Sequence, residues 1–80
     1  MRRGTRQMKT YLSLWFNSEG AKPSEINQRL ISLGFKPMQG THDYVMEWGK
    51  NVNVEEVLRI GDSIQIELQG LNVMFKIETV

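Results

Sequence analysis

Residues 53–69, Asn-Val-Glu-Glu-Val-Leu-Arg-Ile-Gly-Asp-Ser-Ile-Gln-Ile-Glu-Leu-Gln, decide which fold the chain can adopt. Asn53 followed by Glu56 matches a helix N-cap with an acid three positions later, close to the capping-box pattern. An apolar stripe follows at helical spacing, formed by Val54, Val57, Leu58, Ile60 or Gly61, Ile64 and Leu68. This pattern predicts a helix that ends before Gly70.

The same stretch has a competing interpretation as a strand. Residues 63–68 alternate polar and apolar side chains with a strict period of two, and Gly61-Asp62 suits a turn. A glycine inside a helix also costs about 1 kcal/mol relative to alanine. We favour the helix, because its cap and its apolar stripe agree.

A second helix is predicted upstream, over residues 23–33. Pro23 suits the first helical turn, where the missing N–H of proline costs no hydrogen bond. Gly34 lies where a glycine commonly ends a helix. The apolar side chains at helical spacing are Ile26, Leu30, Leu33 and, widening the stripe, Ile31.

Four segments outside these helices are predicted to be strands from their aromatic and β-branched residues and their alternation. They are residues 10–16, 35–39, 41–48 and 72–79. Pro37 weakens the second strand and suits the edge of a sheet. The order strand, helix, strand, strand, helix, strand predicts an α+β fold, the ferredoxin-like sandwich. In it, both helices cover one face of a four-stranded antiparallel sheet whose first and third strands are central.

Alternation predicts which side chains of the strands face the helices. The inward set is Leu12, Leu14, Phe16, His42, Tyr44, Met46, Trp48, Val73, Phe75 and Ile77. The outward set is Tyr11, Ser13, Trp15, Asp43, Val45, Glu47, Met74, Lys76, Glu78 and Val80. No helix is expected over the outward set, which mixes large apolar side chains with charges of both signs.

The composition indicates one small globular domain, which we place at residues 9–80. The 80 residues are 40% hydrophobic and 24% charged, and they include no cysteine. A disulfide scaffold, a thiolate zinc site and a cysteine nucleophile are therefore excluded, and a cytoplasmic location is expected. The longest apolar runs are far shorter than the roughly 20 residues that span a bilayer, and we recognise no signal-peptide core.

The positive charge is concentrated in residues 1–8, which we predict to be a disordered basic leader. Arg2, Arg3 and Arg6 account for three of the ten basic residues, whereas the chain carries nine acidic ones. Without these arginines the folded part is slightly acidic. A nucleic-acid-binding protein that uses the leader and the sheet aromatics is therefore our alternative hypothesis. The negative charges of Asp43 and Glu47 on the outward face would repel a phosphate backbone, unless the two faces of the predicted strand 41–48 are inverted.

We expect the outward face to mediate self-association into a homodimer or a larger homo-oligomer. The residues predicted to form this interface are Tyr11, Trp15, Val45 and Met74. A contiguous apolar patch on so small a domain usually marks an interaction surface, and a second copy would add burial that a short chain lacks. The favoured function is a non-enzymatic module that self-associates and binds a small ligand or a protein partner.

The residues predicted to bind a ligand are Asn17, Ser18, Glu19 and His42. The loop 17–20 is polar and leads towards a helix N-terminus, where anions are attracted. His42 is the one histidine of the chain, and we expect it to hydrogen-bond to neighbouring backbone. A metal site needs three or four convergent ligands, so no metal, cofactor or catalytic residue is predicted. An enzyme that uses His42 as an acid or base is the least favoured hypothesis.

Residues 40–45, Gly-Thr-His-Asp-Tyr-Val, and 78–80, Glu-Thr-Val, resemble the GYD-type small domains. Residues 8–80 also resemble short uncharacterised archaeal proteins through Trp-Phe-Asn-Ser-Glu-Gly at 15–20, and more loosely the effector domain of the leucine-responsive regulators. This resemblance implies a ferredoxin-like fold, pairing of sheets into dimeric barrels and, in some relatives, ligand sensing. CRISPR-associated endoribonucleases are similar in size and strand order, but they place an aspartate where this chain has Asn17.

Overall fold

The computed structural model describes residues 7–80, and the stretch that decides the fold is helical in it. Helix α2 (Val54–Leu68) includes residues 63–68, so the helix is confirmed and the strand alternative is wrong. The predicted cap is present, because the Asn53 Oδ1 accepts a 2.9 Å hydrogen bond from the Glu56 N–H. The Glu56 carboxylate does not reach back to Asn53 and instead lies 3.3 Å from Lys50 Nζ.

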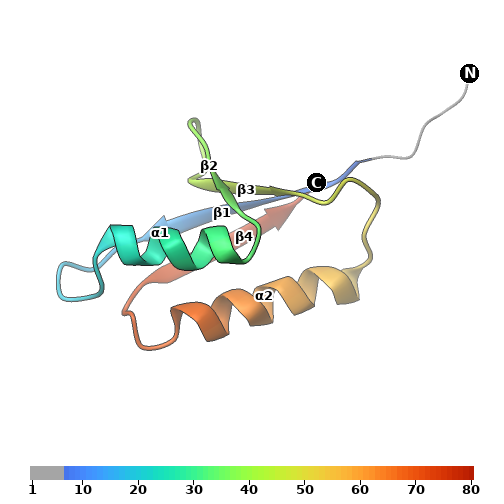
Figure 1. Cartoon of the computed structure of the whole chain (residues 1–80). Coiled ribbons are helices and arrows are strands. Elements are labelled where there is room, and N and C mark those ends of the chain that lie inside the picture. Colours follow the sequence, from blue (N-terminus) through green and yellow to red (C-terminus); the bar gives the residue numbers. More distant parts are fainter. Residues whose placement is uncertain (1–6) are drawn as a thin grey trace, which may run out of the picture.

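The other elements follow the predicted order along the chain (Figure 1). They are β1 (Lys9–Trp15), α1 (Pro23–Ser32), β2 (Lys36–Pro37), β3 (Tyr44–Glu47) and β4 (Met74–Thr79). The four strands form one sheet in the order β2-β3-β1-β4, and all neighbours are antiparallel. This is the predicted ferredoxin-like arrangement, with β1 and β3 in the centre.

Both helices lie on the same side of the sheet, and the hydrophobic core fills the space between them and the strands (Figure 1). The core consists of Leu12, Leu14, Ile26, Leu30, Phe35, Tyr44, Ile64 and Leu68. Burying one aliphatic side chain of this size contributes about 1.5–3 kcal/mol. The core is therefore formed largely by alternate residues of β1 and by the buried apolar stripes of the two helices.

A buried polar contact joins three strands on the helix-covered face. Thr10 is fully buried, and its Oγ1 lies 2.8 Å from the Thr79 Oγ1. The same oxygen accepts a 2.7 Å hydrogen bond from the Trp48 indole N–H. Trp48 therefore faces inward as predicted, although it follows the last residue of β3. The contact connects β1 to β4 and to the end of β3.

β2, β3 and β4 are shorter than predicted. β1 has the predicted length but begins and ends one residue earlier, so one inward assignment on it is wrong. Phe16, placed in the core by alternation, is 51% exposed because β1 ends at Trp15 and the chain enters a turn at Asn17. β2 has only two residues, one of them Pro37, which has no N–H to donate. β3 begins at Tyr44 because residues 41–43 form a bend.

The predicted apolar stripes of both helices are wider than the faces they bury. Val54 and Leu58 of α2 are 72% and 62% exposed, and Ile31 of α1 is also exposed. At 3.6 residues per turn, Leu58 lies about 120° around the helix from the buried Ile64, so both cannot face the sheet. The helix ends behave as predicted: Pro23 begins α1, and Gly34 follows it with a φ of +104°.

The described part of the chain begins just before β1. The predicted basic leader, with Arg2, Arg3 and Arg6, falls outside the described residues except at its end. Met8, which we included in that leader, is hydrogen-bonded into the fold, since its carbonyl accepts from the Trp48 N–H and its own N–H donates to the Lys50 carbonyl. Neither helix within residues 7–80 has the length and apolar character needed to cross a membrane.

Candidate interaction surface

The outer face of the sheet, on the side opposite α1 and α2, is the candidate functional surface (Figure 1). Tyr11 lies opposite Val45 on one neighbouring strand and opposite Glu78 on the other, so these side chains point the same way. We define the outer face as Lys9, Tyr11, Ser13, Trp15, Lys36, Val45, Glu47, Met74, Lys76, Glu78 and Val80. The predicted outward set is therefore confirmed with the exception of Asp43, and Lys9 and Lys36 were missed.

The most exposed apolar side chains on the outer face are neighbours. Trp15 and Met74 lie directly opposite each other in the register of β1 and β4, and they are 54% and 73% exposed. Opposite residues in an antiparallel pair have their Cβ atoms about 4.5–5.5 Å apart. The two side chains therefore form one patch at the end of the sheet where β1 finishes.

Tyr11 and Val45, the other two residues predicted for the interface, form a second cross-strand pair on the same face. Both are half-buried rather than exposed. The Tyr11 ring is stacked against the His42 ring, with centroids 4.8 Å apart and planes inclined by 28°. All four predicted interface residues therefore lie on the same face, as two separate pairs, and one face of the Tyr11 ring is already occupied.

His42 lies over the outer face, so its predicted inward position is wrong. Its Nε2 is 3.2 Å from the Glu78 Oε1, and its Nδ1 is 3.2 Å from the Thr41 Oγ1. It therefore bonds to side chains and not, as we expected, to neighbouring backbone. Alternation requires a continuous strand, whereas the chain bends at residues 41–43 before β3 starts. The loop between β2 and β3 extends to the side of the sheet away from the helices (Figure 1).

Asp43 forms hydrogen bonds with the backbone of β1 and is not part of the outer face. Its Oδ2 accepts a 2.8 Å hydrogen bond from the Leu14 N–H, and its own N–H donates to the Leu12 carbonyl at 2.9 Å. The carboxylate thus supplies the acceptor that a longer β3 would have offered to β1. This role removes one of the two carboxylates that we expected to face a partner.

The loop 17–20, which we predicted to bind a ligand, is held in a turn by hydrogen bonds between its own residues. The Asn17 Oδ1 accepts from the Glu19 N–H at 2.9 Å, and the Asn17 carbonyl accepts from the Gly20 N–H at 2.9 Å. A Cβ at Gly20 would lie 2.5 Å from the Leu71 carbonyl oxygen, so only glycine fits beside that segment. Ser18 is exposed. Within the described chain, no hydrogen bond or ion pair connects this loop to His42.

The outer face carries charges of both signs, Lys9, Lys36 and Lys76 against Glu47 and Glu78, and all five side chains are exposed. Lys36 Nζ lies 3.8 Å from Glu47 Oε2, in addition to the contact between His42 and Glu78. Exposed pairs of this kind contribute at most about 1 kcal/mol each. On the covered side, burial and then the Asp43 charge raise the pKa of Tyr44, whose hydroxyl donates to Asn27 Oδ1.

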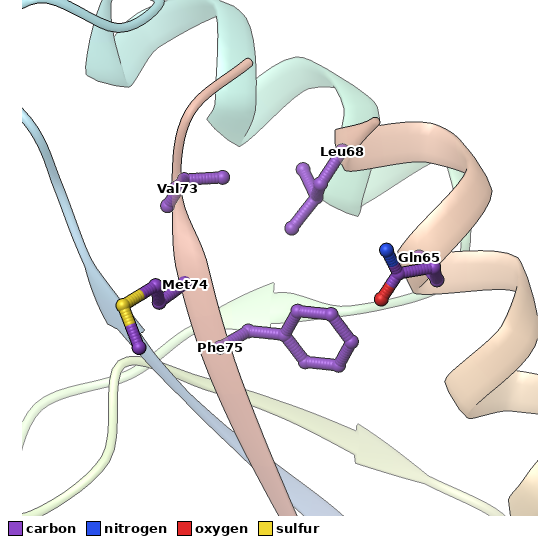
Figure 2. Close-up of a pocket in the computed structure, with 5 residues that line it drawn as sticks. All are labelled: Gln65, Leu68, Val73, Met74 and Phe75. Atoms are coloured by element: carbon purple, nitrogen blue, oxygen red, sulfur yellow. The ribbon is translucent and has the colours of Figure 1, made fainter. Parts of the chain in front are cut away.

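Two shallow cavities flank α2, and the sequence did not predict either. One, of about 270 Å³, is lined by Trp48, Glu56, Arg59, Ile60 and Ser63. The other, of about 260 Å³, lies between the end of α2 and the start of β4 and is lined by Gln65, Leu68, Val73, Met74 and Phe75 (Figure 2). The shape of this second cavity depends on how β4 passes the helix, which no local pattern reports. Among residues 7–80, no group of three or more histidine and acidic side chains could hold a metal ion.

No protein-family model matches the chain, and no curated protein matches it either. Its fold is similar to that of a hypothetical protein from Methanocaldococcus jannascii, known from a crystal structure. The TM-score is 0.57 at 16% sequence identity, and the match covers 94% of this chain and 79% of the archaeal one. A likeness at this level of identity shows that the two proteins share a small α+β fold, and no more.

Proposed function

We propose that the protein is a non-enzymatic binding module that self-associates through the outer face of its sheet. The observation that carries the proposal is the exposed pair of Trp15 and Met74 on a face that no helix of residues 7–80 covers. Exposed apolar patches rimmed by polar groups are typical of association surfaces, and tryptophan is enriched among residues that dominate binding energy.

A second copy of the chain is the occupant that fits this face best. Around the apolar pair the face carries Lys9 and Lys76 as well as Glu47 and Glu78, so two identical faces can place opposite charges against each other. A domain of 80 residues also buries only roughly 60–65% of its unfolded surface, so a second copy adds burial that the monomer cannot supply.

A small polar ligand or a protein partner would be held at the cluster of Tyr11, His42 and Glu78. This cluster combines a stacked ring pair with a carboxylate on the proposed contact face. If a ligand co-purifies, native mass spectrometry will detect its added mass on the wild type, and His42→Ala will reduce the bound fraction. The loop residues Asn17, Ser18 and Glu19 are a weaker second place for a ligand, because the Asn17 side chain is already used within the turn.

The alternative function, nucleic-acid binding, has less support. Base stacking requires a free aromatic face, and His42 covers one side of Tyr11. Glu47 and Glu78 also give the outer face acidic groups that repel phosphates. The leader arginines that would anchor a phosphate backbone fall outside the described residues.

We also propose, from the residues quoted for it, a distant kinship with GYD-type domains and with the effector domain of the leucine-responsive regulators. Those relatives commonly pair their sheets, which agrees with association through the outer face. A cytoplasmic location is proposed as well, since a chain without cysteines suits a reducing compartment.

Sedimentation equilibrium of purified wild type and Trp15→Ser tests the self-association. Truncating a dominant interface residue costs about 2 kcal/mol or more, so we expect the dissociation constant to rise roughly thirtyfold or more. Ile66→Ser is the matched control, since Ile66 is 68% exposed on α2 and lies away from the outer face. A wild type that stays monomeric at high concentration, or an equal loss in both variants, would overturn the proposal.

A further inference from the structure

The two edges of the sheet are protected to very different degrees. β2, at one edge, has two residues, and Pro37 removes one N–H that a neighbouring strand would need. β4, at the other edge, has six residues from Met74 to Thr79 with no proline. No other strand of the described chain pairs with its outer side. An unprotected edge of this length is a ready template for pairing with another strand.

The backbone groups available at this edge follow from the pairing with β1. Lys9 and Val80 exchange two hydrogen bonds, Lys9 N–H to Val80 carbonyl at 2.8 Å and Val80 N–H to Lys9 carbonyl at 2.9 Å. Such exchanges alternate along an antiparallel pair, so every second residue of β4 bonds to β1. The N–H and carbonyl groups of Phe75, Ile77 and Thr79 therefore point away from β1, towards the open edge.

From this edge we infer that β4 pairs in antiparallel fashion with β4 of a second copy, about a two-fold axis at Ile77. The inference does not depend on the outer-face association proposed above, since it uses the side of the strand and not the face of the sheet. In this register Ile77 meets Ile77 of the second copy, and Phe75 meets Thr79. These are the positions whose backbone groups face the edge, so each pair exchanges two hydrogen bonds.

The side chains of β4 are self-complementary about the same axis. Lys76 falls opposite Glu78 of the second copy, and by symmetry Glu78 falls opposite Lys76. Positions between hydrogen-bonded pairs bring side chains closest together, which favours opposite charges there. Met74 falls opposite Val80, and both are exposed apolar side chains on the outer face. A shift of the axis by one residue in either direction would lose the opposition of Lys76 and Glu78.

Helix α2 also presents apolar groups along this edge. Gln65 lines the cavity beside β4 (Figure 2). Val54 and Leu58 share its flank of the helix, at spacings of eleven and seven residues from it. Both are among the most exposed apolar side chains of the chain. The flank towards α1 is the opposite one, marked by Glu67, whose carbonyl accepts a 3.2 Å hydrogen bond from Arg29. The proposed pairing would bring the two exposed flanks towards each other across the axis.

Reversal of charge on β4, made in the Trp15→Ser background so that the outer-face association is already weakened, tests this register. Lys76→Glu and Glu78→Lys each place like charges opposite each other at two symmetric positions, so each should raise the dissociation constant about tenfold. The double variant restores opposite charges and should restore association. Glu78 also contacts His42, but the double variant does not restore that contact, so rescue would exclude a purely intramolecular role. Two damaging single variants without rescue would overturn the inference.

Disulfide trapping gives a second readout, because the chain has no cysteine of its own. Proteins carrying Lys76→Cys and Glu78→Cys are mixed under mild oxidation, and the mixed disulfide should form in preference to either homodimer. The matched control mixes Lys36→Cys, on the protected edge, with Glu78→Cys. Trp15→Ser in both partners should leave the trapping unchanged, which separates this contact from the outer-face one. Trapping no faster than in the control pair would overturn the inference.

Discussion

Neighbouring residues of one strand point to opposite faces of the sheet and therefore have different roles. On β1, Thr10, Leu12 and Leu14 are buried under the helices, whereas Ser13 is half-buried and Trp15 is exposed on the other side. The covered face satisfies its polar groups internally through hydroxyl and indole contacts. The outer face keeps charges of both signs and an apolar pair accessible. We therefore expect substitutions on the covered face to change the stability of the fold, and substitutions on the outer face to change association.

The largest difference is expected between Leu12→Ala and Met74→Ala. Leu12 is fully buried in the central strand, and truncating a buried leucine costs about 2–5 kcal/mol. Met74 lies on the outer face and is mostly exposed, so its truncation should change the free energy of unfolding by less than about 0.5 kcal/mol. Urea unfolding at low protein concentration measures both values for the monomer. Equal losses would contradict the division between the two faces.

A smaller loss is expected when the buried polar contact is removed. Thr10→Val keeps the shape of the side chain but deprives the Trp48 indole N–H of its acceptor, at a cost of about 1–3 kcal/mol. Thr79→Val is the matched control, since it leaves that acceptor in place and should cost less. Urea unfolding of both variants tests the order. If Thr79→Val proved the more damaging, the indole bond would not be the main element of this contact.

The parts of the molecule that the sequence predicted are those fixed by nearby residues. Asn53, Pro23 and Gly34 mark helix ends through local hydrogen bonding or backbone geometry, and all three do so in the structure. Alternation also assigned the outer face of β1 and β4 correctly. It failed at Phe16, His42 and Asp43 because all three lie just outside a strand, where period two no longer applies.

Other features depend on segments far apart in the chain. The buried role of Thr10 arises because Trp48 and Thr79 meet it from two different strands. Residues 41–43 bend because Asp43 bonds to the backbone of β1, about thirty residues earlier in the chain. The cavity lined by Phe75 depends on the path of β4 beside α2, and the other cavity depends on the approach of Trp48 to the same helix. The pattern of residues within one segment does not predict these contacts, because each contact joins segments that are far apart in the sequence.

The covered face should also respond to alkaline pH through Tyr44. Burial, and secondly the charge of Asp43, raise the pKa of Tyr44 in the folded state above the unfolded value of about 10. The folded state thus holds this proton to higher pH, so the associated stability is present below about pH 10 and is lost as pH rises towards the folded pKa. Tyr44→Phe should flatten the fall in the free energy of unfolding, whereas Tyr11→Phe should retain it. An unchanged slope in Tyr44→Phe would refute this assignment.

The smallest effect is expected for His42, whose contacts lie on the outer face. His42→Gln removes the stacking on Tyr11 and the contact with Glu78, yet exposed pairs contribute only about 0–1 kcal/mol. The free energy of unfolding of the monomer should therefore change by less than about 1 kcal/mol, while the NMR signals of the Tyr11 ring shift as the imidazole ring current disappears. Lys36→Gln, which breaks another exposed pair on the same face, is the control and should leave those ring signals in place. A loss as large as that of Thr10→Val would mean that the bend holding His42 supports the sheet, and the outer face would then no longer be separable from the core.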